Sequence, residues 1–346
     1  MGIDAHKRTH TAVAIDEAGR KLGEKTTRMT TTEANLELVR WADSFGPERR
    51  FAVEDCRHLS RRLEADLLAS GEELVRVPPK LMAHARDAAR TYGKSDPIDA
   101  LAVARAAHRE PGLPVARLDG PSRELRLLVD HREDLVRDRV AQINRLRWHL
   151  HELDPSWDPA PRSLVRFKHL DALAARLEPM EGTVAWVARD LVGRIRELTQ
   201  AANDLERRIV QAVSGLAPAL LELAGVGALT AAKLVAEVAD VRRFRSKDAF
   251  ARHNGTAPLP VWSGNHVRHR LSRTGNRQLN AAIHRIAVTQ MRIHQPARDY
   301  LERRIAMGNT KTEALRALKR RLSDVVFRAL LVDADMAAEA RFSDAA

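Results

Sequence analysis

Residues 2–7, GIDAHK, followed by residues 9–16, THTAVAID, decide how the N-terminal part of the chain is expected to fold. The first run places a carboxylate, Asp4, in a short apolar strand. The second run is apolar and β-branched, and it ends at the turn signal EAG, so two adjacent strands are predicted. A carboxylate within a strand is costly to bury unless it is paired or holds a cation. Asp4 therefore needs partners elsewhere in the chain. The plainer alternative is a turn aspartate at a frayed terminus.

Strands and helices alternate through the first eighty residues. Five short apolar runs predict strands, and two longer amphipathic runs between them predict helices. Strands that alternate with helices indicate an α/β sheet with helices on its faces. The predicted strands are residues 2–4, 11–15, 21–27, 50–54 and 73–77, and the predicted helices are 32–41 and 59–70.

A second carboxylate stands in a place comparable with that of Asp4. The run FAVE closes a predicted strand with Glu54. Adjacent strands are about 4.8 Å apart, so two carboxylates at equivalent strand positions could share one divalent cation. Mg²⁺ prefers a few carboxylate oxygens and keeps several waters.

Residues 94–100, KSDPIDA, supply two more acids. Capping alone could explain them: Asp96 is a good N-cap, Pro97 a good first helical residue, and Asp99 an acid that favours the helix dipole. The same geometry also presents Asp96 and Asp99 on one helix face, because residues three apart are neighbours there. Together with Asp4 and Glu54, four acids in this order are more than capping requires.

The composition describes a globular chain with one cysteine. There are 346 residues, enough for two or three domains, and 44% of them are hydrophobic. Cys56 is the single cysteine, so no disulfide can form within the chain, which favours a reducing compartment. No apolar run approaches a membrane span and the N-terminus lacks a signal-peptide core. We therefore expect a cytoplasmic protein, associated with the nucleoid and with no membrane partner.

Positive charge is concentrated in one part of the chain. The net charge is +12, but residues 241–321 hold 19 Lys and Arg against 4 Asp and Glu, a net of +15. An Arg-rich composition alone would spread this charge evenly. A basic block beside a slightly acidic remainder favours a polyanionic partner, and nucleic acid is the first choice.

Two long helices are predicted between the sheet and the basic block. A Pro- and Gly-rich stretch, residues 111–121, marks a domain boundary before a helix over 122–152 and another over 182–214. Apolar residues in the second helix recur every three or four positions, as in a coiled coil. Packing of the two helices on each other and assembly of several chains are equally open. The predicted seam is Val184, Val187, Leu191, Ile195, Leu198, Ala202, Leu205 and Ile209.

Residues 220–234, LLELAGVGALTAAKL, read as a helix, a Gly-x-Gly turn and a second helix. Such a helix-hairpin-helix element brings backbone N–H groups to a phosphate, so Gly225, Val226 and Gly227 are candidate nucleic-acid contacts. These contacts would position nucleic acid without reading its sequence. A plain corner between two helices with a C-cap glycine is the structural alternative.

A serine at a turn lies among arginines further along. Ser263 and Gly264 follow a short apolar run, and Val267 to Leu271 alternates like a strand. A Ser-Gly turn is by itself only a turn. Cations suited to phosphate follow Ser263, however, at Arg268, Arg270, Arg273 and Arg277.

In their order and spacing these motifs resemble those of the DEDD transposases of the insertion-sequence-110 family. The resemblance runs nearly end to end: GIDAHK, FAVE and KSDPIDA in the first third, then LAGVGALTAAKL, FARHNGTAP and SG…RLSRTGNRQLN. It implies an α/β ribonuclease-H-like, RuvC-type catalytic domain over residues 1–117. A coiled-coil helical hairpin over 118–214 would follow, and then a mainly α-helical transposase domain with a helix-hairpin-helix over 215–346.

The resemblance also implies a site and partners. Asp4, Glu54, Asp96 and Asp99 would hold Mg²⁺ (or Mn²⁺), and Ser263 would be the nucleophile on DNA. The partners would be donor and target DNA, a noncoding bridge RNA, and further copies of the chain in a homodimer or homotetramer. In that assembly one subunit's acids would meet another subunit's serine.

Several points stay open at the level of sequence. Ser246 and Ser272 are alternative nucleophiles, and the short first strand leaves the start codon open. Two other functions compete with the recombinase. A metal-dependent, structure-selective endonuclease for DNA junctions would need the acids but not the serine. A non-catalytic architectural protein would need only the hairpin and the basic block.

Overall fold

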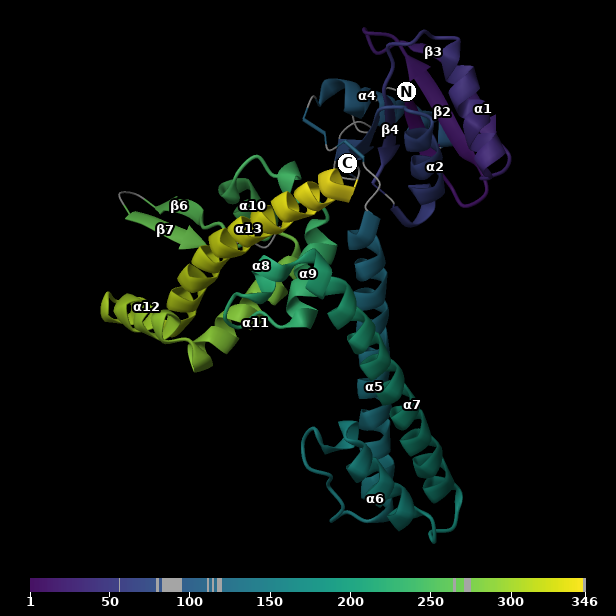
Figure 1. The fold of residues 1–346 in the computed structure, drawn as a ribbon. Helices are drawn as coiled ribbons and strands as arrows, with labels where there is room; N and C mark the ends of the chain where they lie inside the picture. Colours follow the sequence, from purple (N-terminus) through teal and green to yellow (C-terminus); the bar gives the residue numbers. More distant parts are fainter. Residues whose placement is uncertain are drawn as a thin grey trace. The chain divides into compact units, whose positions relative to one another are not determined.

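The computed structural model describes residues 1–55, 57–78, 81–82, 95–110, 112–113, 115–116, 120–263, 266–270 and 275–344 (Figure 1). The chain forms two compact units, Met1–Leu118 and Asp119–Ala346. A further boundary near residue 214, between the helical hairpin and a C-terminal domain, stays a prediction.

The N-terminal unit is built on a mixed five-stranded sheet with the order β3-β2-β1-β4-β5. The first three strands are antiparallel neighbours, whereas β1 runs parallel to β4 and β4 runs parallel to β5. The predicted alternation of strands and helices is confirmed. The elements are β1 Gly2–Ala5, β2 His10–Ile15, β3 Lys21–Thr27, α1 Thr32–Asp43, β4 Phe51–Glu54, α2 Arg57–Ala69, β5 Leu74–Val77 and α4 Asp96–Arg109.

The two faces of this sheet pack against different helices. Ile3 and Val53 belong to a buried cluster with residues of α1 and α2, whereas Ala52, Val75 and Val77 pack with residues of α4. Figure 1 shows these helices on opposite sides of the strands. Because successive side chains of a strand point to opposite faces, the strand residues two apart from Ala52 and Gly2, among them Glu54 and Asp4, belong to the α4 face.

Gly2 allows α4 to approach the sheet closely. A Cβ built on Gly2 would lie 2.2 Å from both the carbonyl oxygen of Ala100 and the backbone nitrogen of Ala104. Real side chains never come so near to backbone atoms, so only glycine fits. The GIDAHK run therefore supplies both the carboxylate and the contact that brings the first turns of α4 over it.

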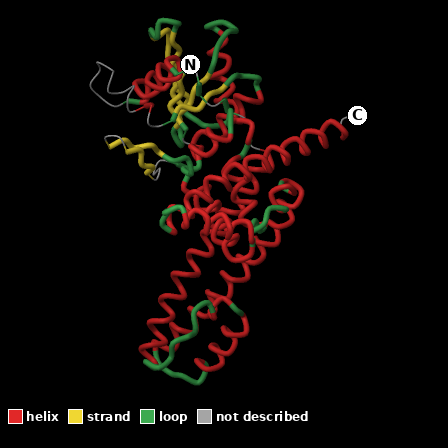
Figure 2. Tube along the Cα trace, turned by 90° about the vertical axis from the view of Figure 1, so that its left-hand side faces the viewer, coloured by secondary structure: helices red, strands yellow, loops and turns green. Residues whose placement is uncertain are grey.

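The second unit is predominantly helical (Figure 2). Its only sheet in the described residues is the two-stranded β6–β7 hairpin. The elements are α5 Gly120–Leu153, α6 Phe167–Leu177, α7 Thr183–Leu216, α8 Pro218–Leu221, α9 Ala228–Val238, α10 Lys247–His253, β6 Leu259–Ser263, β7 His266–Arg270, α11 Arg277–Ile293, α12 Gln295–Ala306 and α13 Lys311–Asp344, with 3₁₀ turns at Ser163–Val165 and Val241–Arg243.

The two predicted long helices are α5 and α7, which run side by side in one chain (Figure 1). The predicted seam on α7 is right at Leu191, Ile195, Ala202 and Ile209, which are buried. It is displaced elsewhere, because α7 also packs against α6 and α9 and so buries a wider stripe than one seam. The half-buried residues are Val184, Val187, Leu198 and Leu205, and the buried ones beside them are Ala185, Ala188 and Thr199.

The largest buried core gathers α9, α10, α11 and α13 around residues such as Phe250, Ile283 and Val326. Within the described residues, no helix combines the length and the apolar character needed to cross a membrane.

Candidate active site

Asp4 lies on β1 in the middle of the sheet, and its residue is 8% exposed. Burial raises the pKa of its carboxyl above the usual value. His6 opposes this shift by charge and by a hydrogen bond, while the nearby carboxylates of Asp99 and Asp96 reinforce it. Asp4 is therefore a carboxylate in a site with excess negative charge, and a bound cation would relieve that excess.

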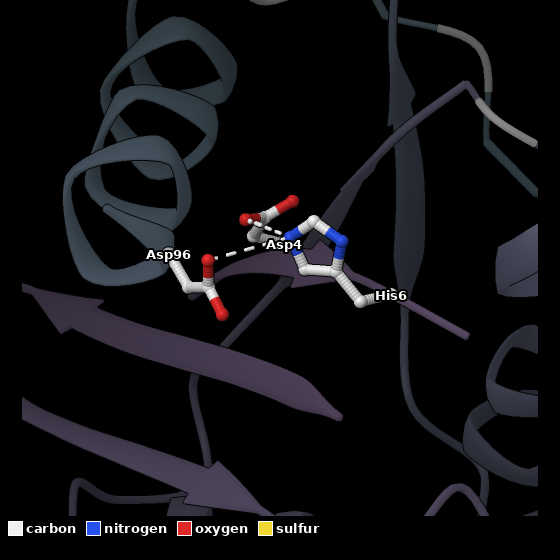
Figure 3. Close-up of side chains that lie close together, drawn as sticks. All are labelled: Asp4, His6 and Asp96. Carbon is white, nitrogen blue, oxygen red and sulfur yellow. Dashed lines mark hydrogen bonds and ion pairs between the residues drawn. The ribbon is translucent and has the colours of Figure 1, made fainter. Parts of the chain in front are cut away.

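Asp4, His6 and Asp96 form a three-residue group that could hold a metal ion. One ligand atom from each lies within 4.8 Å of the other two. His6 Nε2 is 3.0 Å from Asp4 Oδ2 and 3.5 Å from Asp96 Oδ1. Figure 3 shows the imidazole of His6 directed toward both carboxylates, one from β1 and one from the first turn of α4. Asp4 and Asp96 are 92 residues apart in the sequence, and the packing of α4 on the sheet brings them together.

The sequence-based N-cap of α4 was wrong by one residue. Ser95, in extended conformation, is the N-cap and its side chain makes no capping hydrogen bond. Its carbonyl accepts from the backbone N–H groups of Ile98 and Asp99, which makes Asp96 the first helical residue. The carboxylate of Asp96 is thus not a cap, and it faces His6 instead. Capping, the structural alternative for Asp96, loses its main support.

Asp99 and Glu54 also belong to the α4 side of the sheet. Asp99 is 6% exposed and close enough to Asp4 to influence its carboxyl electrostatically. Glu54 follows Val53 as Asp4 follows Ile3, and Ile3 pairs with Val53 in register. Neither is part of the three-residue group found among the described residues. Their roles as ligands stay predictions.

The donor set fits a hard divalent cation. Its atoms are carboxylate oxygens and one imidazole nitrogen, and the acids come from rigid elements rather than loops. Oxygen-rich sites of this kind suit Mg²⁺ or Mn²⁺ better than Zn²⁺, which favours nitrogen and sulfur.

His6 is the member that the sequence-based reading missed as a ligand. It stands two residues beyond Asp4, and residues two apart on an extended segment lie on the same side. An Asp-x-His pair at the end of a strand is the signal that could have revealed it. Because Lys7 follows it, His6 was instead interpreted as half of a basic pair.

The second predicted group centres on Ser263, the last residue of β6. Its backbone pairs with His266 of β7, and Arg268 pairs with Val261. Arg268 and Arg270 both belong to β7, two residues apart. Arg277 is exposed at the start of α11.

The alternatives to Ser263 differ in what can be said of them. The side chains of Ser263, Arg268 and Arg270 lie outside the described part of the structure, as do Ser272 and Arg273 entirely. The hydroxyl of Ser246 accepts a hydrogen bond from the backbone N–H of Ala249 and caps α10. A capping role explains Ser246 without any chemistry.

The Gly-x-Gly turn before α9 has two different glycines. Gly225, at φ +82°, is pressed against α11, with the carbonyl of Ile286 3.3 Å from where a Cβ would stand. Gly227 is the N-cap of α9 and has open space around it, whereas Val226 is buried. Nucleic-acid binding by this turn stays a prediction, and Gly227 is the position with room for a phosphate.

The N-terminal unit is consistent with a ribonuclease-H-like fold. Its mixed sheet, with three antiparallel strands followed by two parallel ones, carries an acidic group under a helix. This combination places the unit in the class of α/β proteins that carry a candidate divalent-cation site on a mixed sheet. Two family models then match the chain: a DEDD transposase model over residues 1–155 and a transposase model of the IS116/IS110/IS902 family over residues 217–302.

The chain belongs to the IS110/IS116/IS900 family of transposases, which cleave DNA and transfer its strands. It is 30% identical over 378 residues to the 44.8 kDa protein of insertion element IS116 from Streptomyces clavuligerus, covering 95% of this chain and 94% of the relative. A 42 kDa protein of IS900 from Mycobacterium paratuberculosis is 27% identical over 95% and 94%. A 43.6 kDa protein of IS110 from Streptomyces coelicolor is 26% identical over 95% and 93%. The two family models place the chain among enzymes, in contrast to the non-catalytic architectural alternative.

Proposed function

We propose that this transposase exchanges DNA strands through a covalent serine intermediate. The acids Asp4, Glu54, Asp96 and Asp99 would hold Mg²⁺ or Mn²⁺, and Ser263 would attack the DNA. The observation that supports the metal-dependent part of the proposal is the approach of Asp4, His6 and Asp96 within 4.8 Å of one another, with Asp99 nearby.

Each side chain has a role in this chemistry. When bound, the divalent cation neutralises phosphate charge and supports the oxygens that attack and leave. The carboxylates of Asp4 and Asp96 would fix its place, because they lie on a central strand and at the start of a helix. His6 would add one imidazole nitrogen to the ligands, because its Nε2 lies 3.0 Å from Asp4 Oδ2 within the same three-residue group.

Ser263 would form the covalent bond to DNA. Its Oγ attacks a backbone phosphorus and loses its proton to solvent or a nearby base, while one deoxyribose oxygen leaves and takes up a proton as a hydroxyl. A serine hydroxyl is a weak nucleophile unless it is activated, and a nearby cationic environment lowers that barrier. The bond energy of the cleaved phosphodiester is retained in the serine ester, so reversal onto another strand restores DNA without an external energy source.

The serine role is tested with a labelled fragment of the element's end. Wild-type protein should yield a DNA species that migrates with covalently bound protein on a denaturing gel, and Ser263→Ala should yield none. Ser246→Ala serves as the matched control, because its hydroxyl caps α10. A Ser263→Ala protein that recombines DNA at the normal rate would contradict the role of Ser263.

The same gel separates the competing enzyme. A junction endonuclease that uses water would need the acids and would cut DNA without a covalent protein adduct. The endonuclease would use the same metal ligands, so the acidic group of Asp4 and Asp96 supports this alternative as well. Free cleaved DNA that persists in Ser263→Ala would favour this alternative.

The partners follow from family membership and stay proposals beyond DNA of the element. We expect a noncoding bridge RNA to pair with donor and target DNA, and a homodimer or homotetramer to combine acids and serine from different subunits. Mixing Asp4→Asn protein with Ser263→Ala protein should restore adduct formation if the subunits share a site. Failure of every mixture to recover activity would contradict the shared site.

A further inference from the structure

Several contacts hold together the two ends of the segment that carries the β6–β7 hairpin. This inference rests on the proposed role of Ser263 and extends it to residues far from the acids. The segment leaves α10 at Asn254 and returns to α11 at Asn276. Figure 1 shows β6 and β7 extending to the side of α10 and α13.

The exit from α10 has a defined backbone shape. Gly255, at φ +71°, donates its N–H to the carbonyl of Arg252, and Thr256 donates to Ala251. This bonding is the Schellman pattern that ends helices at a left-handed glycine. The chain therefore leaves the helix in one direction set by its own hydrogen bonds.

The segment that returns to α11, at Gly275 and Asn276, lies directly against the end of α10. A Cβ on Gly275 would lie 2.3 Å from the backbone nitrogen of Gly255 and 2.4 Å from its Cα, so the two glycines touch through bare backbone. The N–H of Asn276 donates to the carbonyl of His253 at 2.6 Å. No larger residue at position 275 could keep this contact.

Buried asparagine side chains tie the junction to α13. Asn254 is fully buried, accepts from Thr256, and donates through Nδ2 to Ser323 Oγ at 2.8 Å. Asn280 Nδ2 donates to the carbonyl of Asn254 at 2.8 Å, and Lys319 Nζ donates to Asn280 Oδ1. Each of these groups is satisfied, so the junction is rigid on several sides.

Asn276 caps the start of α11 and also connects the junction to α9. Its Oδ1 accepts from the N–H groups of Gln278 and Leu279, which caps α11. Its Nδ2 donates at 2.8 Å to Oε2 of Glu237, which is 8% exposed. The other oxygen of Glu237 is 3.9 Å from Nζ of the buried Lys233.

We propose that these residues form a clasp (Asn254, Gly255, Gly275, Asn276 and Asn280, anchored by Glu237 and Ser323) that aims the hairpin and so positions Ser263. Ser263 stands at the far end of β6, about 13 Å from its first residue at a strand rise of about 3.3 Å. A tilt of about 10° at the clasp would move it by about 2 Å, and misplacement of about 1 Å can cost about 10²-fold in rate. The clasp residues are positioning residues, since they would act on the reaction only through the placement of Ser263.

The hydrogen bond between Asn276 and Glu237 offers a test by exchange of donor and acceptor. Asn276→Asp keeps an oxygen that caps α11, but it has no N–H for Glu237 and sets two carboxylates side by side. Adding Glu237→Gln restores a donor opposite that oxygen. Asn203→Asp, on the exposed surface of α7, is the control for an added negative charge. Asn276→Ser, which also retains a capping oxygen, replaces Asn276→Asp if the latter fails to fold.

Two measurements are made on the full chain. Formation of the covalent adduct should slow about 100-fold in Asn276→Asp while DNA affinity changes by less than about threefold, and the double variant should recover to within about fivefold. Nitroxide labels at positions 266 and 328, in a Cys56→Ser background, should give a narrow distance distribution in the parent and the double variant. The distribution in Asn276→Asp should be broad.

The two readouts separate the clasp from the proposed function. If the parent forms no adduct, Ser263 is not the nucleophile, and the distance distribution still decides whether the clasp aims the hairpin. A distribution that stays narrow in Asn276→Asp would overturn the clasp, as would a double variant that remains both slow and broad. Loss of DNA affinity in step with rate would also overturn it, because a positioning role changes the rate at bound DNA.

Discussion

The two units of the chain use opposite strategies to prepare a functional group. In the N-terminal unit, the carboxylates of Asp4 and Asp99 are buried where β1 and α4 meet, and a bound cation would relieve the excess negative charge around Asp4. In the C-terminal unit, neutral asparagines and glycines are bonded and packed together at the base of the hairpin that carries Ser263, the proposed nucleophile. The first unit places charges for a ligand, whereas the second fixes the direction in which a hairpin leaves the helices.

The largest effect is expected for Asp4→Asn. The amide retains the shape of the carboxylate but not its charge, and metal-ion stabilisation is worth several kcal/mol, so strand cleavage should fall at least about 10³-fold. Because burial and nearby acids raise the pKa of Asp4, removing its charge should leave the free energy of unfolding unchanged or slightly increased. Cleavage assays with an Mg²⁺ titration and denaturant unfolding measure the two quantities.

Asp138→Asn on the exposed surface of α5 controls for the loss of one negative charge. It should leave both cleavage and stability near those of the parent. Asp4→Asn protein that cleaves DNA within about tenfold of the parent rate would remove the acids from the mechanism. Unfolding of the variant would instead give Asp4 a structural role.

The next largest effect is expected on stability, from glycine-to-alanine substitutions in each of the two units. Gly2→Ala places a Cβ 2.2 Å from the backbone of α4, so α4 must shift, and overpacking of this kind should cost about 3 kcal/mol of stability. Gly193→Ala on α7 meets nothing within 4 Å and should stabilise its helix by about 0.5–1 kcal/mol. Denaturant unfolding of both variants gives the sign directly. Equal effects at both positions would show that the close approach of α4 is not needed.

Gly2→Ala also tests the link between packing and site. Since α4 carries Asp96 and Asp99, its displacement should weaken Mn²⁺ binding, measured by calorimetry on protein that is still folded. A variant with lowered stability but unchanged metal affinity would separate the glycine contact from the geometry of the acids.

How far the sequence could predict this molecule differs between the same two regions. The strands, the α4 acids and the long helices were readable because each depends on local periodicity or on a motif of a few adjacent residues. The association of His6 with Asp96 was not, because it needs α4 to lie on the sheet, and Gly2 permits that through a contact with residues about one hundred positions away. The N-cap shifted to Ser95 because its carbonyl, and not the side chain of Asp96, begins the helix.

The clasp was equally hidden in the sequence. Its motifs, HNG and TGN, look like two ordinary turns, and only the folded chain brings Gly255 against Gly275. The predicted seam on α7 was partly displaced for a related reason: a heptad pattern describes packing against one partner, whereas α7 contacts α5, α6, α8 and α9. Long-range contacts decided each of these points, and a single sequence does not contain them in readable form.

A smaller effect is expected from acid. His10 on β2 is 1% exposed, and burial lowers the pKa of its imidazole from 6.5 to about 4. Because the unfolded chain then binds more protons than the folded one, stability is lost as the pH falls from about 6.5 toward 4, by about 2 kcal/mol at pH 5. Hydrogen exchange of amides in β1, β2 and β3 at pH 7 and pH 5 measures this loss.

His10→Gln should remove most of that pH dependence in the sheet. His253, in the C-terminal unit, has its pKa lowered to about 4 by burial and by Arg243, so His253→Gln is the matched control. It should alter acid sensitivity only around α10. Sheet amides that respond equally to both substitutions would show that protonation of His10 is not the cause of the loss in the sheet.

The smallest effect is expected at the basic surface, and it asks whether this surface contacts DNA through local charges. Arg277 is exposed at the start of α11, within the basic block. If it contacts a phosphate, Arg277→Ala should weaken DNA binding about threefold and lower the slope of log affinity against log salt by about 1. Arg207→Ala removes the same charge from α7, where Arg207 pairs with Asp204, and should change neither quantity measurably. Equal losses in the two variants would mean that total charge attracts DNA, and Arg277 would then have no place in the interface.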